Sequence, residues 1–360
     1  MSASALAAKI AGHIRAEGPI SVGAYMAMAL HDPAHGYYAR HEPIGRSGDF
    51  VTAPEISQIF GELIGLWCAD LWLRMGSPDP VILVELGPGR GALLGDFLRA
   101  AESVPDFRAA LRLYLVEASP VLRAAQRQAL VAAQPRFVDG IDAVPEGPLL
   151  LVANEFLDAL PVRQLIRGPV DWAELHVALD AENRLTLAAG AATPMVTALV
   201  PPELRDSPPG TVVEVCPAAA AWVGAVAERV ARRQGAGLFV DYGYYPRKSG
   251  ATLTALRRHR PVELFDDPGT ADLSAHVDFA AVMEAAWAAG AAIHGPVPQG
   301  RFLTALGAEA RLAALCRRAL PPQRARLESG LSRLIDPAGM GTLFKALALV
   351  SPGLPAPAGF

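Results

Sequence analysis

The sequence predicts an α/β fold, a mostly parallel and doubly wound sheet with an N-terminal helical cap and an antiparallel β insertion. Short apolar runs without alternation, closed by glycine or polar residues, are typical of strands buried on both faces of a parallel sheet. Helical segments separate these runs, which implies right-handed crossovers between parallel strands. Over residues 162–216 this rhythm gives way to alternating, β-rich segments.

Residues 1–78 are expected to form the helical cap. A helix over residues 3–17 presents one apolar stripe. Ser21 is placed to cap a second helix that ends near residue 30. After a turn-rich stretch, a wide apolar face predicts a further helix over residues 54–73.

The remaining elements build a Rossmann-like core. Its strands are expected at 81–85, 113–117, 136–139, 149–153 and 237–241, with a final edge strand at 344–350. Its helices are expected at 92–101, 120–131, 218–233, 278–289 and, as an insertion, 307–335. We therefore divide the chain into a cap with a lid loop (1–78), the first part of the core (79–161), a β-rich insertion (162–216), the rest of the core with a helical insertion (217–352) and a loose tail (353–360).

Composition excludes several classes of protein. Hydrophobic residues make up 52% and charged residues 19%, which is enough apolar content for a core and argues against disorder. The net charge of −4 gives no basic field, so no nucleic acid is expected as a partner. Three separated cysteines without a C-x-x-C pair predict neither a metal site nor a disulfide framework. No apolar run is long enough to predict a membrane span.

The strongest local signal follows the first core strand, in Glu85-Leu-Gly87-Pro-Gly89-Arg-Gly91. Glycines there let the backbone turn sharply and let a ligand approach closely. Glu117 ends the next strand, where a carboxylate can accept both hydroxyls of a ribose. This pattern allows a dinucleotide as well, but a carboxylate at Glu85 would repel a pyrophosphate and suits the cationic end of S-adenosylmethionine. The alternative to a nucleotide-binding site is a tight turn without a ligand and with a glutamate at the surface.

Three further motifs lie at strand ends or helix starts. Asn154, Glu155 and Asp158 follow the fourth strand, where they fit either a substrate nitrogen or simple helix capping. Asp241 ends a later strand at the same edge, and a turn after a buried strand explains it equally well. His276 precedes a helix with Asp278 two residues on, as an acid–base pair or as a cap.

The segment from Asp49 to Gln58 is a polar loop that runs into a helix N-terminus. Thr52 and Glu55 lie within it, and Glu55 follows Pro54 as helix starts favour. The residues themselves favour a capped loop; the functional alternative is a lid over a cofactor.

Six stretches of the chain, taken in order, resemble the MidA family. They are residues 45–62, 85–91, 154–162, 241–243, 272–279 and 299–303. The resemblance covers nearly the whole chain, and Gly-Asp-Phe-Val-Thr-x-Pro-Glu-Ile-Ser-Gln-x-Phe-Gly-Glu is highly specific to that family. Its eukaryotic members are mitochondrial complex I assembly factors. The resemblance implies that they are class I methyltransferases and that they dimethylate an arginine of a complex I subunit. The family often has serine at Ala53 and threonine at Ser274, both conservative differences.

The resemblance implies S-adenosylmethionine as cofactor and the side chains that hold it. The implied cofactor residues are Asp49, Thr52, Glu55, Gln58, Glu85, Gly87, Gly89, Gly91, Glu117 and Asn154. It also implies a protein substrate with an arginine side chain. Because the chain starts almost at the shared N-terminal helix, we expect a bacterial, cytoplasmic member, and a homodimer is compatible with the sequence.

The expected reaction is transfer of a methyl group from a sulfonium to a guanidinium nitrogen. Both partners are cationic, and the arginine pKa above about 12 leaves its nitrogen a poor nucleophile. We assign the orienting carboxylates to Glu155 and Asp158, with Asp241 or His276 in support. The alternatives are a small-molecule methyltransferase, a non-catalytic complex I assembly chaperone, and, more distantly, a nicotinamide dehydrogenase.

Overall fold

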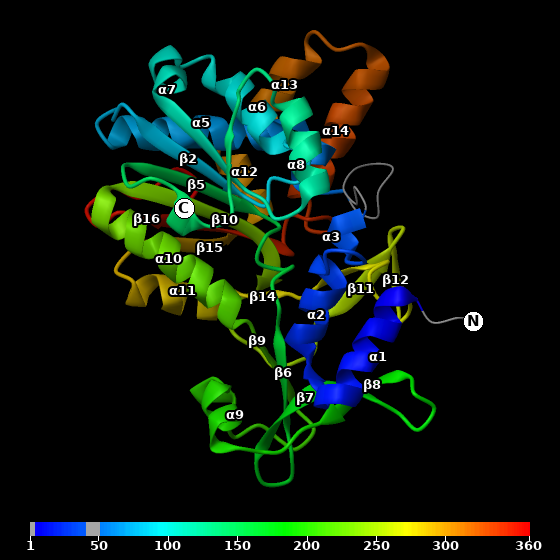
Figure 1. Cartoon of the computed structure of the whole chain (residues 1–360). Coiled ribbons are helices and arrows are strands. Elements are labelled where there is room, and N and C mark those ends of the chain that lie inside the picture. Colours follow the sequence, from blue (N-terminus) through cyan, green and yellow to red (C-terminus); the bar gives the residue numbers. More distant parts are fainter. Residues whose placement is uncertain (1–3, 41–50) are drawn as a thin grey trace. The chain divides into compact units, whose positions relative to one another are not determined.

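The computed structural model describes residues 4–40 and 51–360, which divide into two compact units (Figure 1). The sheet unit comprises Val51–Leu157, Ala221–Gly243 and Ala281–Phe360. The insertion unit comprises the described part of Met1–Phe50 together with Asp158–Ala220 and Tyr244–Ala280.

This division differs from the expected one. The helix after the lid loop belongs to the sheet unit, so the cap ends well before residue 78. Residues 244–280, expected in the core, belong to the insertion unit. The expected boundaries followed the position of each segment in the chain, whereas compact units are defined by how the segments pack.

The sheet unit is built on a sheet whose strands follow the order β15-β16-β10-β5-β2-β3-β4. The strands are β2 (Val81–Leu86), β3 (Leu111–Val116), β4 (Arg136–Val138), β5 (Leu149–Asn154), β10 (Gly235–Tyr244), β15 (Ala292–Pro298) and β16 (Phe344–Val350). The five strands from β4 to β10 run parallel, and β16 is antiparallel to both of its neighbours. The predicted fold class, with a Rossmann-like parallel sheet, is confirmed.

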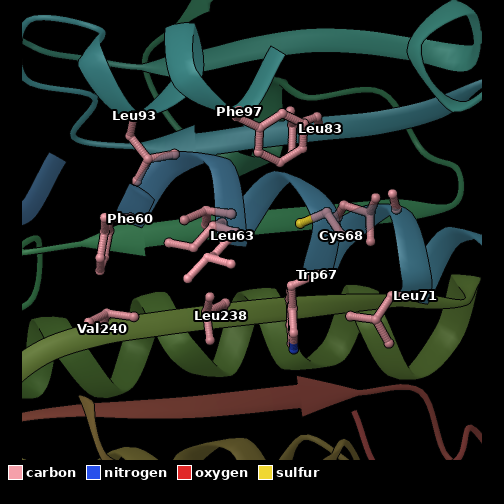
Figure 2. Close-up of a cluster of buried hydrophobic side chains, with 14 of the residues drawn as sticks. Phe60, Leu63, Trp67, Cys68, Leu71, Leu83, Leu93, Phe97, Leu238 and Val240 are labelled. Carbon is pink, nitrogen blue, oxygen red and sulfur yellow. The ribbon is translucent and has the colours of Figure 1, made fainter. Parts of the chain in front are cut away.

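Helices cover this sheet on both faces. They are α4 (Ala53–Ile56), α5 (Gln58–Arg74), α6 (Ala92–Ala101), α7 (Pro105–Ala110), α8 (Pro120–Ala129), α10 (Pro217–Arg233), α11 (Phe279–Ala288), α12 (Gln299–Ala305), α13 (Ala308–Cys316) and α14 (Pro321–Ile335), with a 3-10 turn at Ile141–Ala143. Leu238 of β10 packs in the cluster with α5 (Figure 2). A Cβ on the preceding residue, Gly237, would lie 3.3 Å from Val226 of α10. Since neighbouring strand residues point to opposite faces, α5 and α10 lie on opposite sides of the sheet.

The core between α5, α6 and the sheet is tightly packed (Figure 2). Phe60, Trp67 and Leu71 of α5 are buried with Leu83 of β2 and Phe97 of α6. The two helices meet at glycines: a Cβ on Gly61 would lie 2.7 Å from Asp96, and one on Gly65 2.8 Å from the carbonyl oxygen of Phe97. This close approach fixes α6, and with it the turn that precedes α6.

Three local expectations for the sheet unit were wrong. The helix expected over residues 54–73 is broken at Ser57, whose extended backbone (φ −153°, ψ 130°) separates α4 from α5. β16 is not an edge strand, because β15, whose pairing shifts register between His294 and Val297, lies outside it. The C-terminal tail is not loose: Trp67 donates to the carbonyl of Ala358 at 3.0 Å.

The insertion unit contains the expected antiparallel strands. Its β structure comprises a sheet of order β1-β7-β6-β9, with β8 beside β7, a sheet of order β12-β11-β13, and the short strand β14, which belongs to neither of these two sheets. Its strands are β1 (Ile20–Ser21), β6 (Arg163–Arg167), β7 (Trp172–Leu179), β8 (Leu185–Ala189), β9 (Val212–Val215), β11 (Thr254–Arg257), β12 (Arg260–Val262), β13 (Asp272–Ser274) and β14 (Val277–Asp278). Its helices are α1 (Ala5–Glu17), α2 (Val22–His31), α3 (Tyr37–Arg40) and α9 (Pro194–Leu199), with a 3-10 turn at Pro202–Leu204. Ser21 caps α2 through the amide of Ala24, as expected.

Candidate cofactor and active site

The turn after β2 requires glycine. Gly87, Gly89 and Gly91 all have positive φ, at 59°, 54° and 84°. A Cβ on Gly87 would also lie only 3.1 Å from Cδ2 of Phe156. A side chain at Gly87 would therefore be strained and crowded, so this position requires glycine.

This turn lies where the direction of strand succession reverses. From β2 the chain builds β3 and β4 on one side, then crosses to β5 on the other. Leu86 at the end of β2 pairs with Ala153 of β5, so Gly87 and Asn154 lie at the same carboxyl edge. Ligands of open α/β sheets bind at such a switch point.

Glu85 and Glu117 are buried carboxyl groups on either side of the glycine turn. Burial, with the charge of Glu117 as a second cause, raises the pKa of Glu85 to about 8. Burial also raises the pKa of Glu117, although hydrogen bonds from the Ser119 amide and from Gln126 oppose the rise. Within the described residues, Oε2 of Glu85 has no hydrogen-bond partner. A positive ligand group would offset both the burial and the repulsion.

Gln126 of α8 also contacts the glycine turn and Glu117, and the sequence did not predict these contacts. Its side-chain nitrogen donates to the carbonyl of Gly89 at 2.7 Å and to Oε2 of Glu117 at 3.0 Å. The residue is fully buried. It thus links the glycine turn to the carboxylate at the end of β3. A glutamine among polar helix residues gives no sequence signal, since most such residues face solvent.

Glu155 stands at the end of β5 in a strained backbone conformation. Its φ is +50°, which a residue with a side chain adopts only at a cost of about 1 kcal/mol or more. Its amide donates to the carbonyl of Val240 at 2.9 Å. Its Oε1 accepts from the amide of Ala53 at 3.0 Å and from the side chain of Asn154 at 3.1 Å. The side chain is half-buried, and its carboxylate is oriented by both donors.

Asp241 supports the same loop from β10. Its Oδ2 accepts from the amides of Phe156 and Leu157, at 3.2 and 2.9 Å, and its Oδ1 from the amide of Tyr242. Only 1% of the residue is exposed. These contacts hold the backbone that follows Glu155.

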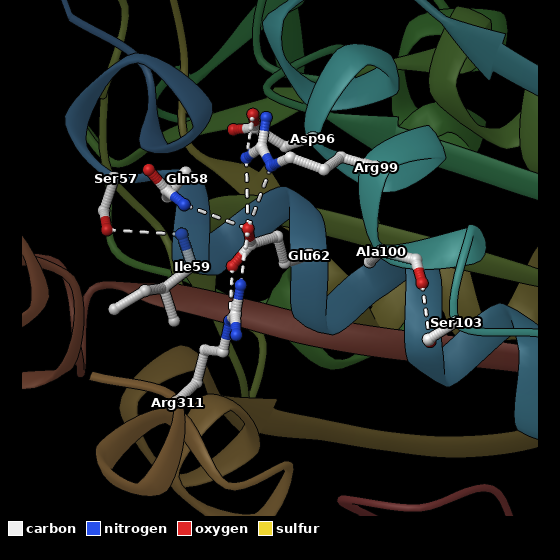
Figure 3. A network of polar contacts seen from close by, with 9 residues as sticks. All are labelled: Ser57, Gln58, Ile59, Glu62, Asp96, Arg99, Ala100, Ser103 and Arg311. Carbon is white, nitrogen blue, oxygen red and sulfur yellow. Dashed lines mark hydrogen bonds and ion pairs between the residues drawn. The ribbon is translucent and has the colours of Figure 1, made fainter. Parts of the chain in front are cut away.

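The Thr52–Gln58 segment approaches this edge through its backbone. Thr52 precedes α4 without a side-chain cap bond, and Glu55 lies in the first turn of α4. The side-chain nitrogen Nε2 of Gln58 donates to Oε1 of Glu62 at 3.0 Å (Figure 3). Asp49, also expected to bind cofactor, lies outside the described residues.

Asp158 and His276 belong to the insertion unit, whereas Glu155 and Asp241 belong to the sheet unit. The carbonyl of Asp158 accepts from the amide of Ala275 at 3.0 Å, so the two predicted segments are neighbours. The amide of His276 donates to Thr252 Oγ1 at 2.9 Å. Two of the four predicted catalytic residues thus lie in each unit.

Neither metal-binding clusters nor membrane spans occur in the part of the chain that the structure describes. No group of three or more His, Cys, Asp and Glu residues is arranged there to hold a metal ion. No helix within residues 4–40 and 51–360 is long and apolar enough to cross a membrane.

A sheet of this order, with a glycine turn between buried carboxylates at its switch point, defines a class I S-adenosylmethionine-dependent methyltransferase. Residues 63–297 match the family model described as "Putative S-adenosyl-L-methionine-dependent methyltransferase". The chain belongs to that family, which confirms its resemblance to the MidA proteins. S-adenosylmethionine is therefore its cofactor, rather than a dinucleotide.

Individual relatives cover almost the whole chain. The mitochondrial protein arginine methyltransferase NDUFAF7 homolog of Drosophila melanogaster is 38% identical, over 96% of this chain and 84% of its own. The human protein arginine methyltransferase NDUFAF7 is 35% identical, over 94% and 81%. A solved structure, a "likely methyl transferase from Burkholderia thailandensis bound to S-adenosyl-homocysteine", is 32% identical with a TM-score of 0.85, covering 99% of this chain and 94% of that one.

Proposed function

We propose that this methyltransferase modifies an arginine side chain of a protein, a subunit of the respiratory complex I type. The relatives named protein arginine methyltransferases support this proposal, because they align with more than nine-tenths of the chain. The observation that carries it is the strained, half-buried Glu155 beside the glycine turn. A non-glycine residue held at positive φ at a strand end is typical of a functional site.

The residues around the glycine turn have different proposed roles in binding the cofactor. Glu117 would accept the ribose hydroxyls, and Glu85 would lie near the cationic end of the cofactor. Gly87 and Gly89, which carry no side chain, would let the ligand approach the backbone closely. When bound, S-adenosylmethionine supplies an electrophilic methyl group on a sulfonium. The residues fit such a ligand, since Glu85 has a buried oxygen that lacks a hydrogen-bond partner among the described residues.

Glu155 orients and partly neutralises the arginine. A guanidinium is always protonated at neutral pH and forms short, directional bonds to carboxylates. A carboxylate beside it offsets the repulsion between the two cations, and takes up the proton that the methylated nitrogen must lose. Asp241 acts through the backbone, because its oxygens hold the amides of Phe156 and Leu157. We propose supporting substrate contacts for Asp158 and His276.

The test is Glu155→Gln, which keeps the size of the side chain and removes its charge. Purified protein is given labelled S-adenosylmethionine and extract from cells that lack the gene. We expect label in protein methyl-arginine to fall at least about 100-fold, while affinity for S-adenosylhomocysteine stays within a factor of about two. Glu102→Gln, at an exposed position, is the matched control.

Two results contradict the proposal. Label found only in small molecules favours a small-molecule methyltransferase. No label in any fraction, from wild-type protein that still binds cofactor and partner, favours an assembly chaperone. A bacterial, cytoplasmic location and a homodimer stay predictions, which cell fractionation and light scattering would check.

A further inference from the structure

The backbone at the start of α4 is fixed from two sides. Its first amide, that of Ala53, donates to Oε1 of Glu155 at 3.0 Å, and Ala53 is fully buried. Thr52, which precedes it, makes no side-chain cap bond. The carboxylate of Glu155 therefore satisfies one of the backbone amides that have no partner within the helix at the start of α4. Any shift of α4 moves a hydrogen-bond donor of Glu155.

The other end of α4 rests against α14. A Cβ on Gly330 would lie 3.0 Å from the carbonyl oxygen of Ile56 and 3.5 Å from Cβ of Ser57. Gly330 is buried within the helix and has no positive φ, so its backbone does not require glycine. Close approach to Ile56 requires it. Alanine is otherwise the better residue inside a helix, by about 1 kcal/mol.

A buried ionic cluster anchors the segment that follows (Figure 3). Glu62 of α5 is 1% exposed and accepts from Gln58 at 3.0 Å. Arg311 of α13 donates to both its oxygens, at 2.7 and 3.0 Å, and Arg99 of α6 donates at 3.1 and 3.2 Å. Three helices thus converge on one carboxylate immediately after the α4–α5 break. Gln58 is thereby tied to α13 through Glu62.

We propose that α13 and α14 form a positioning support for Glu155. The contact of Gly330 with Ile56 and the pairing of Arg311 with Glu62 hold α4 where the amide of Ala53 meets the carboxylate of Glu155. In this proposal Gly330 acts through α4, and Arg311 acts through α5. The catalytic consequence rests on the proposed function of Glu155, but the structural link does not.

Hydrogen exchange of the full-length protein, without cofactor, tests the link directly. In Gly330→Ala, the new methyl group displaces Ile56, and exchange of the amides in residues 51–56 should quicken by about ten-fold. Gly224→Ala is the matched control, because it makes the same change inside α10 and meets no atom within 4 Å. Glu155→Ala gives the rate expected when the acceptor is lost. Exchange in Gly330→Ala that equals wild type and control overturns the proposal.

Arg311→Met tests the second anchor and serves if Gly330→Ala does not fold. We expect faster exchange in residues 51–58, by a few-fold, whereas Arg324→Met, which removes an exposed arginine from α14, should change nothing. Equal exchange in the two arginine variants contradicts the role of the Glu62 cluster.

Kinetics separate positioning from general damage. Gly330→Ala should lower kcat by about ten-fold and leave the KM for cofactor nearly unchanged. In a Glu155→Gln background the same change should have little further effect. An equal loss in both backgrounds contradicts positioning through Glu155. If Glu155→Gln alone is fully active, the proposed function fails, and the exchange result still decides the structural link.

Discussion

The ends of β2 and β5 lie side by side, but their glutamates are held in opposite ways. Glu85 is buried, and its pKa is raised to about 8. Glu155 is half-buried, its backbone is strained at φ +50°, and its Oε1 accepts from two donors. Among the described residues Oε2 of Glu85 has no hydrogen-bond partner, so a positive ligand group can pair with this carboxyl group. The direction of the Glu155 carboxylate is instead fixed by its two donors. The comparison indicates that one strand end binds a cation and the other orients a reacting group.

The largest expected effect is at the β2 end. Gly87→Val places a branched side chain at φ +59° against Phe156, and should weaken binding of S-adenosylhomocysteine by more than about 100-fold in calorimetry. Gly76→Val is the control, because Gly76 also has positive φ, 82°, but no atom within 4 Å of its Cβ. If both variants bind as wild type does, the turn does not hold the cofactor. If both lose binding, backbone strain explains the loss without any steric block.

A smaller effect should come from the residue that links the turn to β3. Gln126→Leu removes hydrogen bonds to Gly89 and Glu117, and should weaken cofactor binding by about ten-fold, or about 1.4 kcal/mol. Gln128→Leu makes the same change on the exposed face of α8 and should bind normally. Equal affinities in the two variants would show that Glu117 needs no positioning.

The smallest effect is a pH dependence that comes from the raised pKa of Glu85. Its raised pKa means that the folded protein keeps a proton that the unfolded chain releases above pH about 4.3. The contribution of Glu85 to the free energy of unfolding therefore falls as pH rises toward about 8. A bound cation favours the carboxylate, so cofactor binding should release a proton and tighten by roughly nine-fold between pH 6 and 7.

Calorimetry in buffers of different ionisation enthalpy measures that proton. Wild-type protein should release close to one proton at pH 7, and Glu85→Gln should release none at this site. An unchanged proton count in Glu85→Gln would assign the titration to another group. The β5 end gives the contrast: Glu155→Gln should leave the proton count as it is.

The β2 end was predictable from sequence because its causes are local. An apolar run without alternation predicts a buried strand, and glycines after it predict the open turn at Gly87. The same local logic places Glu117 at the end of the next strand, β3. The motif after β5 was equally compatible with helix capping, because the strain at Glu155 is not visible in residue types.

Contacts between distant segments were beyond such reasoning. The amide of Ala53 and the carboxylate of Glu155 are 102 residues apart, and their hydrogen bond depends on the fold. Ser57 breaks the expected helix because its side chain caps α5 through the amide of Ile59. The sequence around Gly330 does not show why a helix has glycine at this position. The reason is the close packing of α14 on Ile56, which leaves no room for a side chain.

A crystal structure of the protein with S-adenosylhomocysteine tests the central claim most directly. We predict the ribose hydroxyls on the carboxylate of Glu117 and the amino-acid end beside Gly87 and Glu85, with the carboxylate of Glu155 directed toward the acceptor. Ligand density at any other position, or a turn closed by Phe156 against the soaked ligand, would contradict the account.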